Sequence, residues 1–279
     1  MTSVTTTQAR LRAVPAGGHR AGFRGTLRSE LTKIRSVRST YWTLILLVLV
    51  SIAWSIAFCA GTASHWSPGQ KAGFDPTQSS IVGMAQLGQL VIIVLGTLAI
   101  TSEYSTGMIR TSLTVMPRRI VVYGAKATVF AAAALVVALP AGFACFFIGQ
   151  ALLAPTHVTA TLSQPGVVRA VIGAGLYVVL CGLFAFGLGA VLRSTAGAMT
   201  TAYGLLFLLP ELAKALPSAW YIELERWLPG GDVVNAVTGT QSVNVSPHLF
   251  SGWGELAVFA GYTAALLILG AIGFRSRDA

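Results

Sequence analysis

Long stretches without a charged side chain constrain this chain more than any other feature of its sequence. Residues 39–70 contain no Lys, Arg, Asp or Glu. Over the whole chain 10% of residues are charged and 54% are hydrophobic, whereas a soluble domain carries about 25% charged residues. So few charges cannot cover a water-facing surface of a chain this long. The sequence therefore predicts a polytopic membrane protein and argues against an ordinary cytosolic enzyme.

Six apolar segments approach or exceed the roughly 20 residues that a helix needs to cross a bilayer. They are predicted at 42–61, 81–101, 121–147, 168–192, 197–216 and 253–274. The fifth is the weakest, because its uncharged run ends at Pro210 and a full crossing must include Glu211 and Lys214. A half-span that ends at Pro210 is the alternative. The predicted fold class is an all-α membrane protein with six transmembrane helices.

A cleaved signal peptide is the competing interpretation of the first apolar segment. The basic region before this segment is too long for such a peptide, and its apolar run exceeds the usual length of about 7–15 residues. We therefore interpret the segment as a retained span.

The distribution of basic residues predicts the orientation of the six spans. With the N-terminus inside, 15 of the 19 Lys and Arg residues lie on the inner side and 4 on the outer side. Both termini are therefore predicted to be cytoplasmic, with residues 1–22 disordered and 275–279 forming a short tail. The net charge of +10 would suggest nucleic acid for a soluble protein. Here the charge flanks apolar runs, so the expected contact is a lipid bilayer and not a nucleic acid.

The stretch 23–41 has the pattern of an amphipathic helix that lies in the headgroup layer. Leu27, Leu31, Ile34 and Tyr41 share one face, and basic residues fill much of the rest. The predicted interfacial anchors are Arg28, Lys33, Arg35, Arg38 and Trp42. A soluble basic helix is the alternative.

Several kinds of chemistry are missing from the sequence. No phosphate-binding loop of the form GxxxxGK[ST] occurs, so the chain has no P-loop ATPase site of its own. The four histidines are isolated, and the three cysteines are far apart and interpreted as small residues buried in the membrane. The spans carry almost no acidic residue apart from Glu211, which argues against an ion-coupled transporter. Lys214 follows Glu211 at the spacing of a helical ion pair.

The inner loop, residues 101–119, is the most informative segment. Gly107 and Pro117 bracket a stretch that can be helical, in which Ile109, Leu113 and Met116 share one face. A short cytoplasmic helix tied to the second and third spans could act as a lever for a soluble partner. A tight basic loop is the alternative interpretation.

The inner loop resembles that of type-2 ATP-binding-cassette transporter permeases. The resemblance rests on Glu103-Tyr104-x-x-Gly107-x-x-Arg110-x-x-Leu113-x-x-x-Pro117-x-Arg119, followed by Lys126 early in the third span. Glu30-Leu31-x-Lys33-x-Arg35 before Tyr41-Trp42 resembles the interfacial entry helix of that family, and the six-span layout is similar too. Met108 departs from the family, which commonly has threonine there.

The resemblance implies a permease subunit of an exporter that uses ATP hydrolysed by a separate cassette subunit. It implies no enzyme activity and no cofactor in this chain, a second permease copy or paralogue as partner, and a plasma-membrane location. The residues expected to dock the ATPase are Glu103, Gly107, Ile109, Arg110, Leu113, Pro117 and Arg119. Drugs, peptides, lipids and polysaccharide-linked molecules are the usual substrates of the family. A non-transporting assembly or sensor protein is the alternative from another class.

Two stripes of small residues mark close helix packing. Cys181, Ala185 and Gly189 form one in the fourth span, and Ala257, Gly261 and Ala265 form the other in the sixth. Both are interpreted as packing within the bundle rather than between subunits.

Overall fold

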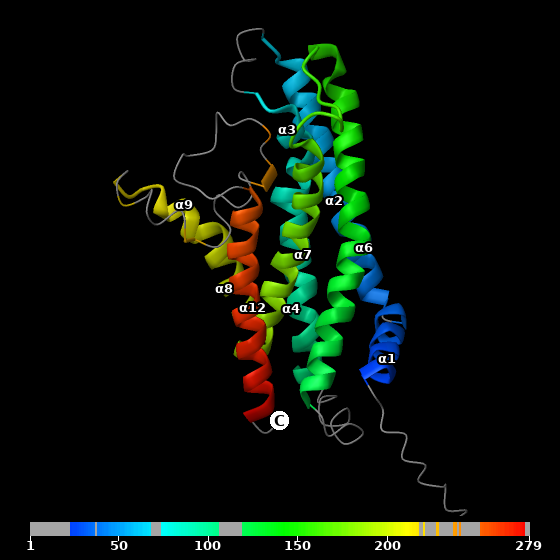
Figure 1. Cartoon of the computed structure of the whole chain (residues 1–279), viewed down its shortest axis with the longest axis vertical. Coiled ribbons are helices and arrows are strands. Elements are labelled where there is room, and N and C mark those ends of the chain that lie inside the picture. Colours follow the sequence, from blue (N-terminus) through cyan, green and yellow to red (C-terminus); the bar gives the residue numbers. More distant parts are fainter. Residues whose placement is uncertain are drawn as a thin grey trace, which may run out of the picture.

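The computed structural model describes residues 23–36, 38–67, 74–105, 119–217, 220, 227–228, 237–238, 240 and 252–276. Within these residues the secondary structure is helical and contains no strand. Six helical segments are long and apolar enough to cross a membrane: Arg38–Ser64, Pro76–Ser102, Ile120–Thr156, Val167–Leu192, Thr195–Ala213 and Gly252–Gly273. The prediction of an all-α, multi-pass membrane protein is confirmed (Figure 1).

Two of the six spans are interrupted by a short change of helix type. The entry helix α1 (Phe23–Ser36) precedes the first span, α2 (Arg38–Ser64). The second span consists of α3 (Pro76–Gly83), the π-helical η2 (Met84–Gly88) and α4 (Gln89–Ser105), and the third consists of α6 (Arg119–Leu153) with the 3-10 turn η3 (Ala154–Thr156). The fourth span is α7 (Val167–Leu192), the fifth consists of α8 (Thr195–Tyr203), the π-helical η4 (Gly204–Leu208) and α9 (Leu209–Ala213), and the sixth is α12 (Gly252–Ser276). The second and fifth spans are therefore each built from two α-helical halves joined by a π segment.

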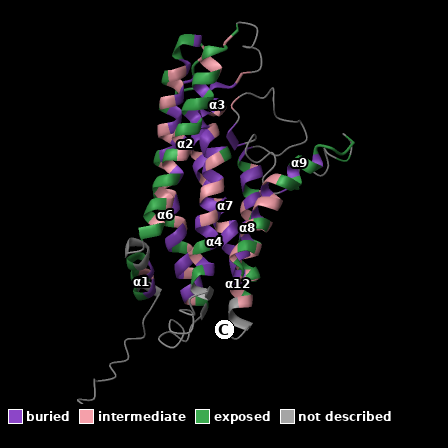
Figure 2. Ribbon diagram, turned by 180° about the vertical axis from the view of Figure 1, so that it is seen from behind, coloured by how far each residue is buried: buried purple, intermediate pink, exposed green. Residues whose placement is uncertain are grey.

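The fourth span, α7, is the central helix of the bundle. It packs against α4, α6, α8 and α12, and 78% of its most apolar stretch is buried, against 22% for the first and sixth spans. Figure 2 shows the same contrast in colour, with purple along α7 and α4 and more green on α2 and α6. The stripe Cys181, Ala185 and Gly189 is buried, which confirms that it packs within the bundle.

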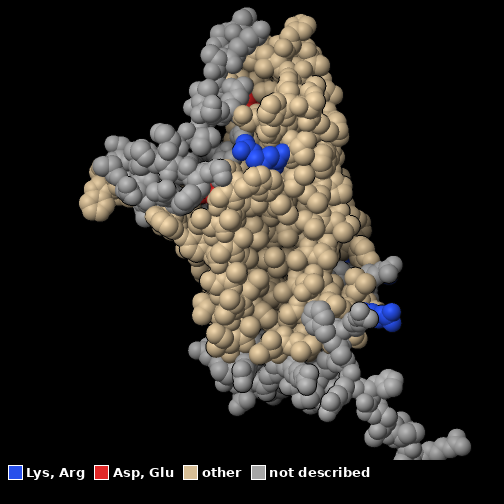
Figure 3. All heavy atoms as spheres, in the orientation of Figure 1, with Lys and Arg blue, Asp and Glu red and all other residues tan. Residues whose placement is uncertain are grey.

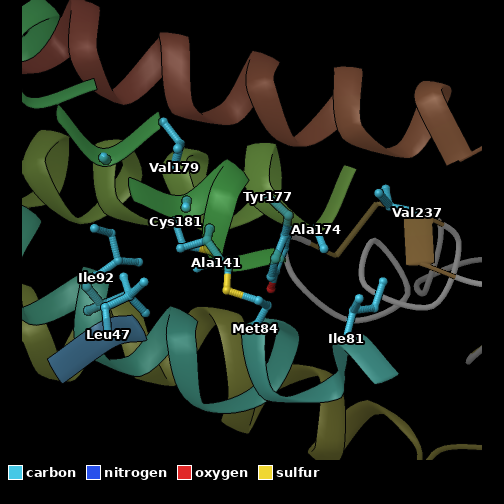
Figure 4. Close-up of a cluster of buried hydrophobic side chains, with 14 of the residues drawn as sticks. Leu47, Ile81, Met84, Ile92, Ala141, Ala174, Tyr177, Val179, Cys181 and Val237 are labelled. Carbon is cyan, nitrogen blue, oxygen red and sulfur yellow. The ribbon is translucent and has the colours of Figure 1, made fainter. Parts of the chain in front are cut away.

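Glycine lets α7 and α4 approach each other closely. A Cβ atom added to Gly96 of α4 would lie 2.1 Å from the backbone oxygen of Gly182 in α7. Backbones this close require small residues on both helices. Around them the core is completed by larger side chains, among them Leu47, Met84, Ile92 and Tyr177 (Figure 4).

The stripe of small residues in the sixth span lies on the exposed side of its helix. Ala257, Gly261 and Ala265 are exposed, and a Cβ atom at Gly261 would meet nothing within 4 Å. The interpretation of this stripe as internal packing is therefore wrong. The helix α12 instead turns Phe259 inward, and its ring lies 5.6 Å from that of Tyr177 and 5.7 Å from that of Phe184. A large aromatic side chain buries more apolar area than a small stripe does, and this decides the face.

The second span begins at Pro76, five residues before the predicted start at 81, because Asp75 caps it. One carboxylate oxygen of Asp75 accepts the backbone N–H groups of Thr77 and Gln78 at 2.9 and 3.1 Å, and Pro76 occupies the first turn. Both features are typical of helix starts. The other carboxylate oxygen accepts the N–H of Thr240 at 2.5 Å and its hydroxyl at 2.8 Å.

The fifth span continues beyond Pro210 as far as Ala213, so the alternative of a half-span ending at Pro210 does not hold. Glu211 and Lys214 form an ion pair of 2.6 Å between exposed side chains, as their spacing predicts. All three cysteines are free and buried within the bundle. In the view of Figure 3, described Lys, Arg, Asp and Glu side chains are scarce along the body of the bundle, which is the surface that contact with lipid requires.

Candidate functional site

One end of the bundle carries both segments that the sequence singles out. The helix α4 ends at Ser105 and α6 begins at Arg119, so the inner loop leaves and re-enters the bundle at this end. The entry helix α1 and the end of α12 lie at the same end (Figure 1). We call it the loop end.

A buried ion pair fixes α1 to the bundle at the loop end. The ammonium of Lys126, in α6, lies 2.8 Å from a carboxylate oxygen of Glu30 in α1, and the two side chains are only 11% and 4% exposed. Thr26, one helical turn before Glu30, is also buried. Opposite charges in so little water attract strongly, and either charge alone would be costly there. The pair therefore holds α1 in one position on α6.

The entry helix has two different faces. Thr26 and Glu30 pack toward the bundle, whereas Leu31 is 47% exposed and Tyr41, just beyond α1, is 46% exposed. Leu31 and Tyr41, two members of the predicted apolar face, are thus exposed, and the contact with α6 includes Glu30 instead. A polar face, absent from the sequence interpretation, makes that contact.

The sequence did contain a signal for this contact. Glu30 is the only acidic residue before Asp75, and Lys126 is the only charged residue between Arg119 and Arg169. A lone acid in a basic helix and a lone base in an apolar span are each expensive unless they meet. Lys126, at only 11% exposed, does meet Glu30 in this way.

The structure describes the side chains of only some of the predicted site residues. Arg28 and Arg38 are exposed, and Trp42 is 70% exposed. Four residues have a helical backbone but side chains outside the described part: Lys33 and Arg35 in α1, Glu103 in α4 and Arg119 at the start of α6. Gly107, Ile109, Arg110, Leu113 and Pro117 lie outside the described residues altogether. The docking role of the inner loop therefore stays a prediction.

Hydrogen bonds tie the other spans together at the loop end. The hydroxyl of Thr195, at the start of α8, donates to the hydroxyl of Thr101 near the end of α4 at 2.8 Å. Arg193, which ends α7 with a left-handed φ of 54°, donates to the backbone oxygen of Gly273 in α12 at 3.2 Å. The second span is thereby joined to the fifth, and the fourth to the sixth.

A second set of polar contacts, partly buried and partly exposed, surrounds the π segment η2. The hydroxyl of Tyr177 in α7 donates to the side-chain oxygen of Gln89 at 2.6 Å. Tyr203 of α8 donates to the backbone oxygen of Leu90 at 2.8 Å, and the indole of Trp54 donates to Gln86 at 2.9 Å. Because the second span begins at Pro76, Gln86 and Gln89 lie well inside it.

Metal binding finds no support in the described part of the chain, where no three His, Cys, Asp or Glu side chains come together. No protein-family model matches the sequence, and no curated protein matches it significantly.

Proposed function

We propose that this chain is the transmembrane permease subunit of an ATP-binding-cassette exporter. In this proposal a separate cassette subunit hydrolyses ATP on the cytoplasmic side of the plasma membrane, where both termini lie. The chain pairs with a second permease copy or a paralogue, and α1 together with the inner loop docks the cassette subunit.

The observation that carries the proposal is the buried Glu30–Lys126 pair. Lys126 lies seven residues after Arg119, where the inner loop ends, so the pair joins the entry helix to the root of the loop. A soluble partner that presses on α1 or on the loop would act on the same helix, α6. A buried charge pair transmits such a force well, because separating the two charges in so little water is costly.

The multi-pass helical fold supports the same proposal. The loop roots are the ends of two spans, α4 and α6, which both pack on the central helix α7. The Thr101–Thr195 contact extends this connection to the fifth span. A push at the loop end can therefore reach most of the bundle through direct contacts.

The test is co-purification of the native partner with the full chain and with the variants Glu103→Ala and Arg110→Ala. Loss of one charge-assisted contact costs about 1.5–3 kcal/mol, so we expect at least about a tenfold loss of a bound cassette subunit. Lys214→Ala is the matched control, because it removes a basic side chain just after the fifth span, at the end of this span that lies away from the loop end. Full retention of the partner by both loop variants would overturn the docking role.

A second measurement addresses the division of labour. The purified chain alone should hydrolyse no ATP, because it contains no phosphate-binding loop. Hydrolysis by the chain free of any partner would contradict the proposal.

A further inference from the structure

The fifth span changes its helix type at its midpoint. The regular helix α8 ends at Tyr203, and the π segment η4 covers the five residues Gly204–Leu208. Pro210 follows in α9. Proline has no N–H to bond the carbonyl four residues earlier, and its ring needs room beside that carbonyl, which here belongs to Leu206. A widened turn just before Pro210 supplies that room, and π segments of this kind are often found at functional sites.

The half of the fifth span before η4 is held by the second span at two heights. Thr195 donates to Thr101 at 2.8 Å at the loop end, and Tyr203 donates to the backbone oxygen of Leu90 at 2.8 Å deeper in the bundle. Between them Ala198 and Ala202 are both 0% exposed. Two hydroxyl contacts and a buried alanine face leave α8 little freedom to move apart from α4.

The half after η4 is packed differently. Leu209 and Leu212 are 37% and 59% exposed, and only Pro210 and Ala213 of α9 are buried. Within η4 itself, Leu208 is 59% exposed and a Cβ atom at Gly204 would meet nothing within 4 Å. Figure 1 shows α9 leaving the bundle at an angle, away from α4 and α7. Among the described residues, no side-chain hydrogen bond from this half to another span corresponds to those of Thr195 and Tyr203.

We propose that Thr195 and Tyr203 are positioning residues that make α8 move with α4 as one unit. In this proposal η4 is the joint about which the half of the fifth span after η4 turns. The helix α4 leads directly into the inner loop, so a displacement of the loop would move α4 and α8 together. The half after η4 would then change its angle to the bundle. Only the source of the motion rests on the proposed function; the joint itself does not.

The experiment measures distances between spin labels on the full chain in lipid nanodiscs, without any partner. One pair joins Leu98→Cys in α4 to Thr200→Cys in α8, and a second pair joins Leu98→Cys to Leu212→Cys in α9. All three introduced sites are exposed. The native cysteines stay in place because each is 0% exposed, and the chain without introduced cysteines should take up no label.

We expect a narrow distance distribution for the 98–200 pair and a broad one for the 98–212 pair. The double variant Thr195→Val with Tyr203→Phe should broaden the 98–200 distribution, because both hydroxyl contacts are lost. Thr128→Val is the matched control, since its hydroxyl bonds only to Gly124 within its own helix. Deletion of Leu205 should restore a continuous α-helix and narrow the 98–212 distribution.

Two outcomes would overturn the proposal. A 98–212 distribution no broader than the 98–200 distribution would show that η4 is not a joint. An unchanged 98–200 distribution in the double variant would show that the hydroxyls do not hold α8. Failure of the proposed function is distinguishable, because loss of the cassette partner in the Glu103→Ala variant is measured separately and does not enter these distances.

Discussion

Two regions of this molecule contain the same two features in opposite surroundings. The first region, made of α1 and the first four spans, has the π segment η2 and the Glu30–Lys126 pair, both largely buried. The second region, the fifth span beyond Tyr203, has the π segment η4 and the Glu211–Lys214 pair, and this pair is 68% and 54% exposed. A π segment or an ion pair is thus not rigid or stabilising in itself. Its neighbours decide what it contributes.

The difference is clearest in the side chains around each π segment. Gln86 lies within η2 and Gln89 follows it, and they accept hydrogen bonds from α2 and α7. The N–H of Gly83, just before η2, donates to the hydroxyl of Ser55 at 3.1 Å. The side chains of η4 are all apolar: Leu206 is buried in the core at 3% exposed, whereas Leu208 is 59% exposed. A segment with hydrogen bonds to neighbouring helices resists turning more than one that has apolar contacts alone.

Breaking the buried ion pair should have the largest effect. Lys126→Met removes the ammonium that lies 2.8 Å from the buried Glu30 carboxylate, and removal of one member of a buried pair costs about 3–5 kcal/mol. We expect a loss of this size in the free energy of unfolding, measured by SDS titration with circular dichroism. The double variant Glu30→Leu with Lys126→Met should recover most of it. No recovery in the double variant would mean that Lys126 acts through something other than this pair.

Alanine substitutions at Gly83, just before η2, and at Gly204, in η4, should change the stability of the protein by different amounts. A Cβ atom at Gly83 would lie 1.9 Å from the backbone oxygen of Ser51, so α2 would have to move. Overpacking of this kind costs about 1–3 kcal/mol, occasionally more. Gly204 has open space around its Cβ position, so Gly204→Ala should be neutral or stabilising by up to about 1 kcal/mol. Equal unfolding midpoints for the two variants would remove the contrast between the regions.

Removing the hydroxyl of Tyr177 should lower the stability of the first region, α1 and the first four spans, by a smaller amount. Tyr177→Phe leaves Gln89 without its 2.6 Å donor while the ring stays in place. Hydrogen bonds between membrane helices contribute about 0.6 kcal/mol on average and at most about 1.7 kcal/mol. Tyr262→Phe is the control, because that hydroxyl donates at 2.8 Å to the backbone of Trp227 near an exposed surface. Thermal unfolding in the same detergent should rank the Tyr177 variant below the control.

The exposed pair should matter least. Lys214→Met removes an ion pair between helical neighbours that water can reach, and such pairs contribute about 0.2–0.5 kcal/mol. We expect an unfolding free energy almost equal to that of the wild type. A loss as large as that of Lys126→Met would show that Glu211 and Lys214 are buried in the membrane-bound protein, against a second copy or another partner.

The sequence anticipated some elements of the site and not others. The apolar run after Arg38 is a local signal and was anticipated, whereas the cap at Asp75 was missed and the start of the second span was therefore predicted five residues too late. The Glu30–Lys126 contact joins residues 96 positions apart, and no local pattern pairs them. The outward direction of Ala257, Gly261 and Ala265 was also missed, because a helix has several faces and only its neighbours decide which one is buried.

The sequence by itself determined that this chain crosses a membrane with six helices. The reason is local, since a run of about 20 apolar residues is stable in a bilayer as a helix whatever lies beside it. The tertiary structure alone decided that α7 is central, that α1 docks through a polar face, and that η2 is surrounded by hydrogen bonds to neighbouring helices while η4 has apolar contacts alone. These outcomes depend on contacts between side chains far apart in the chain, and close packing gives each of them a single partner.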